Sequence, residues 1–358
     1  MGRRPGARRP VPVAQLPAVH LASDVPRAVV AARLRAGTWT KVGHGTYLPV
    51  ECDAPWRSTP AAPARTLAAD QGTAPVRPRS QQDGPRFSRH QVQADAGGAA
   101  LDRRTVALAQ IAGTARRLRA PVVFSHVSAA LLWGLPLWRT PRQVHVLQQS
   151  TASARSDAAV VRHTTLVDDE DVRLVAGLRV TSLERTLVDC AALLEPIAGL
   201  VVADAALAAG ADPGDVDRRV HAARGARHAV RMRAVVAHAD AGAESPYESA
   251  SRFVVLRDGL PRPQTQVRVE TRLGAVWSDW GWEEFSLLAE YDGRTKYAGI
   301  EQSAFMAEKR RHDALLEAGQ RVVRVVADDL RGSELTARLL PLLPRSVQRA
   351  RRPRPDLH

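Results

Sequence analysis

Cysteine is almost absent from this chain, because only Cys52 and Cys190 occur among its 358 residues. Two cysteines so far apart cannot build a disulfide framework or a cysteine-based zinc cluster, and a reducing, cytoplasmic setting fits this count. No window approaches the roughly 18 uninterrupted apolar residues of a membrane span. Behind the basic N-terminus, Pro10, Pro12 and Pro17 break the segment, so no signal-peptide core forms. We therefore expect a soluble cytoplasmic protein with no membrane partner.

Lysine is nearly as rare as cysteine. Of 51 basic residues only Lys41, Lys296 and Lys309 are lysines, and the rest are arginines. Against 37 acidic residues this gives a formal net charge of +14, which points to a polyanionic partner, most often nucleic acid. Because so strong an arginine bias also follows from a GC-rich genome, single arginine clusters carry little weight. The three lysines become more informative for the same reason.

No glycine-rich phosphate loop of the Walker or dinucleotide type is present, which argues against a nucleotide-dependent enzyme. The length allows two or three domains of ordinary globular composition. Segment 55–102 is rich in Ala, Pro, Gln, Gly and Ser, so we expect a disordered linker there. Segment 333–358 is predicted to be a basic tail. Three candidate domains remain in a mixed α/β chain, at 1–54, 103–243 and 244–332.

The N-terminal candidate domain shows a helix followed by a hairpin. Asp24 is placed to cap a helix that runs to Ala36 and stops at Gly37, and a β-hairpin is predicted between Trp39 and Val50. This order matches the back half of a winged helix-turn-helix, whose recognition helix and wing contact phosphates. The expected DNA-binding residues are Arg27, Arg33, Arg35, Lys41 and His44. A small αββ unit with merely solvated arginines is the alternative.

The middle candidate domain is expected to be mostly helical, an α+β unit with a few short strands. Those strands are predicted near 121–124, 143–147 and 160–164. His126 lies at a strand-to-helix junction, and Arg185 and Asp189 are four residues apart on one helix. Since no glycine elbow or matching nucleophile, base and acid accompany them, His126 is predicted to be a helix cap or a satisfied core histidine.

The C-terminal candidate domain gives the clearest pattern of elements. A helix is predicted from Ser245 to Leu256, ending at Asp258-Gly259. Three strands, a long helix and a last strand follow, at 264–270, 274–280, 285–291, 300–318 and 321–326. The order is αβββαβ, which describes a mixed sheet flanked by helices.

Carboxylates fall at particular places on that frame. Asp279 is predicted at the end of the second strand, while Glu290 and Asp292 leave the same face of the third. Converging carboxylates repel one another and are best explained by a hard divalent cation, Mg²⁺ or Mn²⁺. Such a cation can activate water and stabilise charge on a phosphodiester. Lys296 is close enough in the chain to orient that water, and Glu248 on the first helix could complete the acidic ring.

Each of these residues also has a plainer interpretation. Asp292-Gly293 is a strong turn signal, and Glu290 could be a half-exposed strand residue. Lys296 and Lys309 could be ordinary solvated charges. That two of the three lysines lie in this segment favours the metal site.

A family resemblance is carried by the runs Ser278-Asp-Trp280, Leu288-Ala-Glu-Tyr-Asp-Gly-Arg-Thr-Lys-Tyr297, Glu308-Lys-Arg-Arg-His-Asp313 and Gly319-Gln-Arg-Val-Val-Arg-Val325. Over about 244–330 they resemble the very-short-patch-repair-like endonuclease domain of many actinobacterial proteins, a branch of the PD-(D/E)xK nuclease superfamily. The resemblance implies a restriction-endonuclease-like αβββαβ core that hydrolyses DNA with Mg²⁺ or Mn²⁺. It also implies that Asp279 is the first motif aspartate, Glu290 the second acid and Glu248 the acid of the first helix.

The chain departs from the superfamily pattern at two places. Where the superfamily has lysine, two residues after Glu290, this chain has Asp292, as the very-short-patch-repair-like branch also does. The role of that lysine therefore passes to Lys296, with Lys309 as a second candidate. Asp279 is followed by Trp280 and an acidic turn, which keeps only part of the expected hydrophobic pattern and leaves an inactive nuclease fold as an alternative.

The front of the chain carries a second resemblance. The run from Leu34 to Leu48 resembles the winged helix-turn-helix of the AbiEi-type antitoxin of type IV toxin–antitoxin systems. Phe124–Leu135 and Val180–Asp189 resemble the associated middle region. This implies promoter binding with Arg27 and Arg33 near the groove, and a cognate toxin as partner. Two hypotheses follow: a metal-dependent DNA endonuclease, or a catalytically inactive antitoxin or transcription regulator that binds DNA without cutting it.

Overall fold

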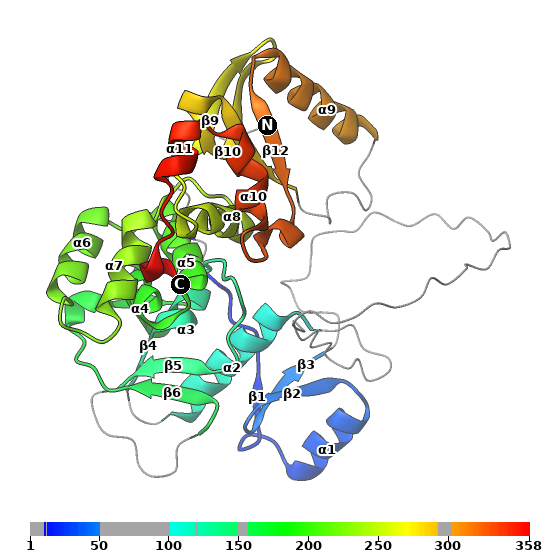
Figure 1. Cartoon of the computed structure of the whole chain (residues 1–358). Helices are drawn as coiled ribbons and strands as arrows, with labels where there is room; N and C mark the ends of the chain where they lie inside the picture. Colours follow the sequence, from blue (N-terminus) through cyan, green and yellow to red (C-terminus); the bar gives the residue numbers. More distant parts are fainter. Residues whose placement is uncertain (1–10, 12, 51–100, 119–120, 149–156, 293–301) are drawn as a thin grey trace, which may run out of the picture.

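The computed structural model describes residues 11, 13–50, 101–118, 121–148, 157–292 and 302–358 (Figure 1). These residues form three β-sheets and the helices packed on them, which confirms the expected mixed α/β class. Lys296 and nearly all of the predicted linker 55–102 lie outside the described residues. Within the described part of the chain, no helix is both long enough and apolar enough to cross a membrane.

The N-terminal unit is one helix and a three-stranded antiparallel sheet. Its elements are β1 (His20–Leu21), α1 (Arg27–Arg35), β2 (Trp39–Gly43) and β3 (Thr46–Pro49), with strand order β1-β3-β2. Helix α1 ends just before Gly37, whose φ of +69° is a conformation that glycine adopts at low cost. Asp24 does not cap this helix, because its carboxylate pairs instead with Arg116. The predicted helix and hairpin are present.

Helix α2 (Arg103–Arg117) joins this unit to the middle of the chain. The Asp102 side chain caps it by accepting a hydrogen bond from the Thr105 backbone N–H. Ala109 and Ala112 pack in one hydrophobic cluster with Val42 and Leu48 of the hairpin. Three other apolar side chains of the same helix pack against the middle sheet, namely Ala107, Leu108 and Ile111. One helix therefore covers two sheets.

Among its described residues, the middle region contains a five-stranded sheet, five α-helices and one 3-10 helix. The sheet comprises β4 (Val123–Phe124), β5 (Val144–Leu147), β6 (Val160–His163), β7 (Val172–Val175) and β8 (Leu178–Thr181) in the order β6-β5-β4-β8-β7. Its helices are α3 (His126–Leu132), η2 (Asp169–Asp171), α4 (Leu183–Leu193), α5 (Pro196–Ala208), α6 (Pro213–Ala222) and α7 (Ala229–His238). The three predicted strands are β4, β5 and β6, whereas β7 and β8 were not foreseen.

The C-terminal region follows the predicted αβββαβ order. It begins with α8 (Pro246–Arg257), β9 (Gln264–Thr271), β10 (Gly274–Trp282), η3 (Glu283–Phe285) and β11 (Leu287–Tyr291). It continues with α9 (Gln302–Glu317), β12 (Arg321–Val325), η5 (Ala327–Leu330), α10 (Glu334–Leu339), η6 (Leu340–Leu342), α11 (Arg345–Ala350) and η7 (Pro355–Leu357). The sheet order is β12-β11-β10-β9, with β11 and β12 parallel and the other pairs antiparallel.

Helices cover both faces of this four-stranded sheet (Figure 1). On one face Val255 of α8 and Leu339 of α10 share a cluster with Trp280 and Leu287. On the other face Leu315 of α9 packs with three strand residues, Val267, Val269 and Leu288. The sheet is thus a buried central layer.

The middle and C-terminal regions share a hydrophobic core. Phe253 and Leu256 of α8 belong to the same buried cluster as α4, α5 and α7. Arg252, which is fully buried, donates to both carboxylate oxygens of Asp204 on α5 at 2.8 Å. The predicted boundary between 243 and 244 therefore falls between two segments that pack closely together.

Segment 333–358, predicted to be a basic tail, folds onto the rest of the chain. Leu335 and Leu339 are buried in the C-terminal core, and Leu357 is buried against the middle helices. The C-terminal segment packs directly against Gly259, where a Cβ atom would lie 2.0 Å from the carbonyl oxygen of Arg352. The prediction weighed the arginines of this segment and overlooked the leucines between them, whose burial stabilises the folded form.

Candidate active site

Three of the predicted acids lie on neighbouring strands or at their end: Asp279 on β10, Glu290 on β11, and Asp292 just after β11. Trp280 pairs with Ala289 in the antiparallel register, so the two strands run side by side at this point. The backbone N–H of Tyr291 donates to Asp279 Oδ2 at 2.7 Å. Asp279 therefore lies beside the residue that separates Glu290 from Asp292. Strand β10 continues to Trp282, so Asp279 lies within the strand instead of at its end.

Glu248 lies in the first turn of α8, which Ser245 caps by accepting a hydrogen bond from the Glu248 backbone N–H at 3.2 Å. The Glu248 carboxylate is buried and accepts a hydrogen bond from the Glu244 backbone N–H at 2.6 Å. Burial, and next the negative charge of Asp279, raise the pKa of Glu248 to about 7. The structure thus brings Glu248 and Asp279 close enough to repel each other.

Glu290 is only 4% exposed and has one satisfied and one unsatisfied oxygen. Its Oε1 accepts a hydrogen bond from Nη2 of Arg311 on α9 at 2.6 Å. Among the described residues its Oε2 is buried without a hydrogen-bond partner. A buried carboxylate oxygen in that state is costly, and it is the kind of atom that a cation or a further donor would satisfy.

Two arginines bind the acids around β11. Arg324 of β12 lies opposite Glu290 in the parallel register and reaches Asp292 Oδ2 at 3.5 Å. The same guanidinium contacts Glu308 Oε1 at 2.9 Å, and Arg311 lies 3.6 Å from that atom. Three carboxylates and two guanidinium groups therefore form one network, and Asp279 and Glu248 add further acidic charge beside it.

Sequence reasoning gave no role to Arg311, Arg324 or Glu308, although all three lie in the runs that carried the family resemblance. Helical spacing could have paired Glu308 with Arg311, which are three residues apart. The parallel pairing that places Arg324 opposite Glu290 could not have been read from the chain. Lys309, the second lysine candidate, is exposed on α9 and forms no ion pair with any described residue.

These side chains are of the chemical kind that binds hard divalent cations, although among the described residues no three of the acids bring oxygens within 4.8 Å of one another. Mg²⁺ and Mn²⁺ take oxygen ligands, and Asp279, Glu290 and Asp292 offer carboxylate oxygens from adjacent strands. The unpartnered Oε2 of Glu290 and the repulsion between Glu248 and Asp279 are both relieved by positive charge. The guanidinium of Arg311 already supplies part of that charge to Glu290.

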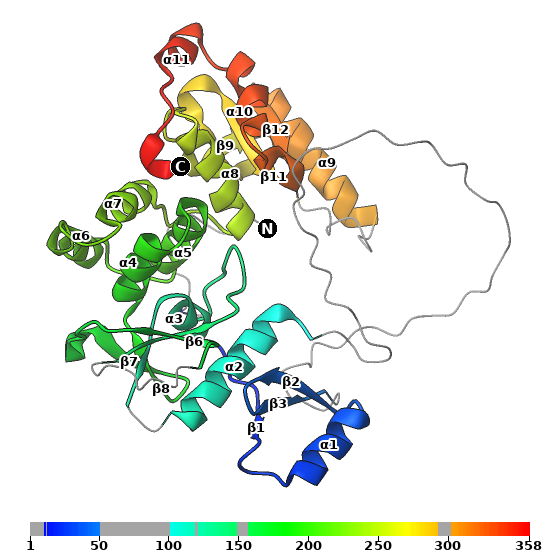
Figure 2. The same ribbon diagram turned by 60° about the horizontal axis from the view of Figure 1, so that its bottom comes forward.

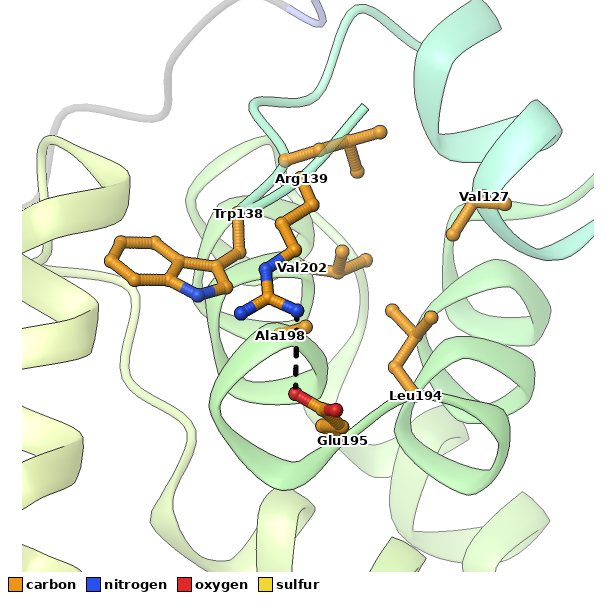
Figure 3. Close-up of a pocket in the computed structure, with 8 residues that line it drawn as sticks. Val127, Trp138, Arg139, Leu194, Glu195, Ala198 and Val202 are labelled. Carbon is orange, nitrogen blue, oxygen red and sulfur yellow. Dashed lines mark ion pairs between the residues drawn. The ribbon is translucent and has the colours of Figure 1, made fainter. Parts of the chain in front are cut away.

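A row of aromatic rings lies beside the acids. Tyr247, next to Glu248, stacks on Tyr291 with ring centroids 4.7 Å apart. Trp138, from the loop between α3 and β5, meets Tyr247 edge-on at 5.3 Å. Trp138 also borders a small, mostly apolar pocket between the loop and α5 (Figure 3). Arg139 and Glu195, which also line this pocket, form an ion pair at 4.0 Å. The row thus connects the middle region to the acidic strand ends.

The predicted DNA-binding residues of the N-terminal unit are solvent-exposed. In α1 only Val30 is buried, so Arg27, Arg33 and Arg35 all project into solvent. Lys41 is exposed on β2. None of these four cations pairs with a carboxylate in the described part of the chain. In both views α1 lies at the opposite end of the molecule from α9 and β12 (Figures 1 and 2).

Comparison with known proteins identifies two relatives of unassigned function. They are uncharacterized proteins of Mycobacterium tuberculosis strains CDC 1551 / Oshkosh and ATCC 25618 / H37Rv, each 32% identical over 179 residues. The match spans 49% of this chain and 65% of each relative, just under two thirds of their length. No protein-family model matches the chain. No solved structure is significantly similar to it.

Proposed function

We propose that this protein binds DNA and that its C-terminal region is a Mg²⁺-dependent endonuclease that hydrolyses phosphodiester bonds. The observation that carries the proposal is the closeness of Glu248 on α8 to Asp279 on β10, next to the strand that holds Glu290. One buried oxygen of Glu290 has no partner among the described residues. Structural acids are normally satisfied by donors, whereas acids that hold a metal keep an oxygen available for it.

Each acid has a role in this proposal. Asp279, Glu290 and Asp292 would hold Mg²⁺ or Mn²⁺, which when bound polarises the phosphodiester and lowers the pKa of water. Glu248, whose pKa is near 7, is able to accept or release a proton at neutral pH. Lys296 stays the predicted residue for orienting water, at a position outside the described residues. The guanidinium groups of Arg311 and Arg324 offset the mutual repulsion of the acids.

The N-terminal unit supplies the DNA-binding module in this proposal. A winged helix-turn-helix would place α1 in the groove and the β2–β3 hairpin against the backbone. The exposed cations Arg27, Arg33, Arg35 and Lys41, none of which pairs with a carboxylate among the described residues, support this arrangement. They are the residues that would contact phosphates and set the salt dependence of binding.

Plasmid nicking tests the enzyme proposal. The purified full chain is incubated with supercoiled plasmid and Mg²⁺ or Mn²⁺, and nicked and linear products are measured. We expect the parent to cut and Asp279→Ala and Glu290→Ala to lose about 100-fold or more in rate, the scale of losing one transition-state stabiliser. Glu284→Ala, which removes an exposed acid from η3, is the matched control and should cut normally. Equal cutting by all variants, or none by the parent, would contradict the proposal.

A second function is favoured by one specific observation. Arg311 and Arg324 already pair with Glu290 and Asp292, as they would in a nuclease fold that has lost its metal. The protein would then be an AbiEi-type antitoxin or transcription regulator that binds DNA without cutting it and acts with a cognate toxin. This alternative predicts no metal-dependent nicking, together with footprint protection of its own promoter that is weakened in an Arg27→Ala, Arg33→Ala variant.

A further inference from the structure

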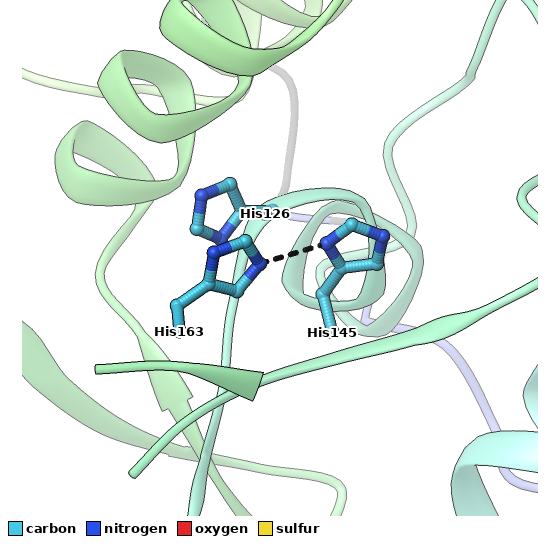
Figure 4. Close-up of side chains that lie close together, drawn as sticks. All are labelled: His126, His145 and His163. Atoms are coloured by element: carbon cyan, nitrogen blue, oxygen red, sulfur yellow. Dashed lines mark hydrogen bonds between the residues drawn. The ribbon is translucent and has the colours of Figure 1, made fainter. Parts of the chain in front are cut away.

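Three histidines from different elements of the middle region lie together, away from the acidic strands. His126 is the first residue of α3, His145 lies on β5 and His163 ends β6 (Figure 4). The antiparallel pair of Phe124 with Val146 brings the start of α3 to β5. The parallel register of β5 and β6 places His145 and His163 on the same face, two residues apart along the ladder. The cluster is therefore fixed by the topology of the sheet.

The ring nitrogens are close enough to share one ion. One nitrogen from each ring can be chosen so that the three lie within 4.8 Å of one another. His145 Nδ1 and His163 Nε2 are 3.0 Å apart. The His126 ring stacks on that of His163 with centroids 3.9 Å apart. In a tetrahedral zinc site with Zn–N bonds of 2.0–2.1 Å, ligand nitrogens are about 3.3 Å apart, so a small shift of His126 completes the set.

The backbone holds His126 in an unusual conformation. Its φ is +51°, in the left-handed region that a non-glycine residue adopts only at a cost in free energy. The residue is also only 8% exposed, so its imidazole ring is directed into the protein instead of into solvent. Such strain persists where the surrounding structure requires a particular side-chain position.

The protonation and hydrogen bonding of the rings suit metal ligation. Burial, and next the neighbouring histidines, lower the pKa of His126 to about 2, and burial lowers that of His145 to about 4. Both rings are thus neutral at physiological pH and keep a lone pair. Ser125 Oγ lies 3.0 Å from His126 Nδ1, so a proton held on Nδ1 leaves Nε2 free for an ion.

We propose that His126, His145 and His163 form a binding site for a divalent transition metal, with Zn²⁺ as the best-fitting ion. Three imidazoles match the borderline-soft preference of zinc, in contrast to the oxygen ligands that Mg²⁺ prefers. In the described part of the chain no carboxylate or thiol joins the three nitrogens. The fourth position is therefore taken by water or a small anion. The ion would tie α3, β5 and β6 together, independently of the nuclease proposal.

Metal analysis of the full chain tests this site. The protein, purified without a polyhistidine tag, is stripped with chelator, equilibrated with Zn²⁺ or Co²⁺, and freed of excess ion. We expect about one Zn²⁺ per chain by elemental analysis and visible absorption typical of tetrahedral Co²⁺. Excess Mg²⁺ should displace neither ion. The melting temperature should rise with Zn²⁺ concentration, because an ion bound to the native state stabilises it.

Two ligand variants and one control complete the test. His145→Ala and His163→Gln should bind Zn²⁺ at least 10- to 100-fold more weakly and lose the Co²⁺ spectrum. His221→Ala, which removes an exposed histidine from α6, should behave as the parent. Circular dichroism and melting in chelator establish that each variant is folded. Binding well below one ion per chain in the parent, or undiminished binding in folded ligand variants, would show that the cluster is only a hydrogen-bonded histidine stack.

Discussion

At the scale of single residues, Glu248 has both a structural role and an unusual pKa. Its carboxylate holds the backbone before α8, yet it is buried close to Asp279. The unfolded chain releases the Glu248 proton near its ordinary pKa of 4.5, whereas the folded chain keeps it until about pH 7. Stability from this residue is therefore present at low pH and declines as the pH rises between these two values.

Glu248→Gln tests that behaviour, because glutamine stays neutral and keeps an acceptor for the Glu244 N–H. We expect the free energy of unfolding of the variant to fall less than that of the parent between about pH 5 and pH 8. The gap should approach roughly 3 kcal/mol at the upper end, at 1.36 kcal/mol for each pKa unit. Urea denaturation at a series of pH values measures it. Glu284→Gln is the exposed control, and identical pH profiles for parent and Glu248→Gln would contradict the assigned pKa.

At the scale of elements, the C-terminal order was predictable because β9 alternates apolar and polar residues, β11 and β12 are short runs rich in apolar residues, and Ser245, Gly259 and Gly319 mark helix ends. Strands β7 and β8 were missed because each is only four residues long and Leu174, an apolar residue of β7, is exposed. Of the four predicted acids, Glu248 and Asp279 lie close enough to repel each other, but among the described residues no three of the acids bring oxygens within 4.8 Å of one another. Their arginine partners were not predicted, since the pairing of Arg324 with Asp292 depends on which strands become neighbours. The histidine cluster escaped prediction for the same reason, as only His126 drew attention and no spacing connects it to His145 and His163.

The buried pair between Asp204 of α5 and Arg252 of α8 is one of the electrostatic contacts between the two regions that were predicted to be separate domains. Asp204→Asn or Arg252→Met should destabilise the fold by about 3–5 kcal/mol, because either change leaves a buried polar group without its partner. Chemical denaturation followed by circular dichroism measures the loss. Arg218→Ala, which breaks the exposed pair with Asp215, should change stability by less than about 1 kcal/mol. A double variant, Asp204→Leu with Arg252→Met, should recover much of the loss, and an equal loss in all variants would contradict the assigned role.

At the scale of the whole molecule, the positive charges behind the net charge of +14 are unevenly distributed. Many of the arginines of the middle and C-terminal regions pair with carboxylates, as Arg185, Arg252 and Arg324 do. The cations of α1 and β2 pair with no carboxylate in the described residues, and these elements lie at the far end of the molecule from β11 and β12 (Figure 2). Helix α2 contacts both the hairpin and the middle sheet, so it holds the N-terminal unit in a fixed relation to the rest. Under the proposed function, in which the N-terminal unit binds DNA and the C-terminal region cuts it, such a connection would be needed.

The salt dependence of DNA affinity tests whether the N-terminal unit is the DNA-binding part, as proposed. If Arg27 and Arg33 each neutralise one phosphate, Arg27→Ala with Arg33→Ala should lower the slope of log affinity against log salt by about 1.8, at roughly 0.9 per contact. Fluorescence anisotropy with labelled duplex over a range of salt concentrations measures the slope. Arg224→Ala with Arg227→Ala removes the same charge from the exposed turn between α6 and α7 and should leave the slope nearly unchanged. Equal slopes for both double variants would mean that DNA binding depends on the overall net charge and that α1 is not a specific DNA-binding element.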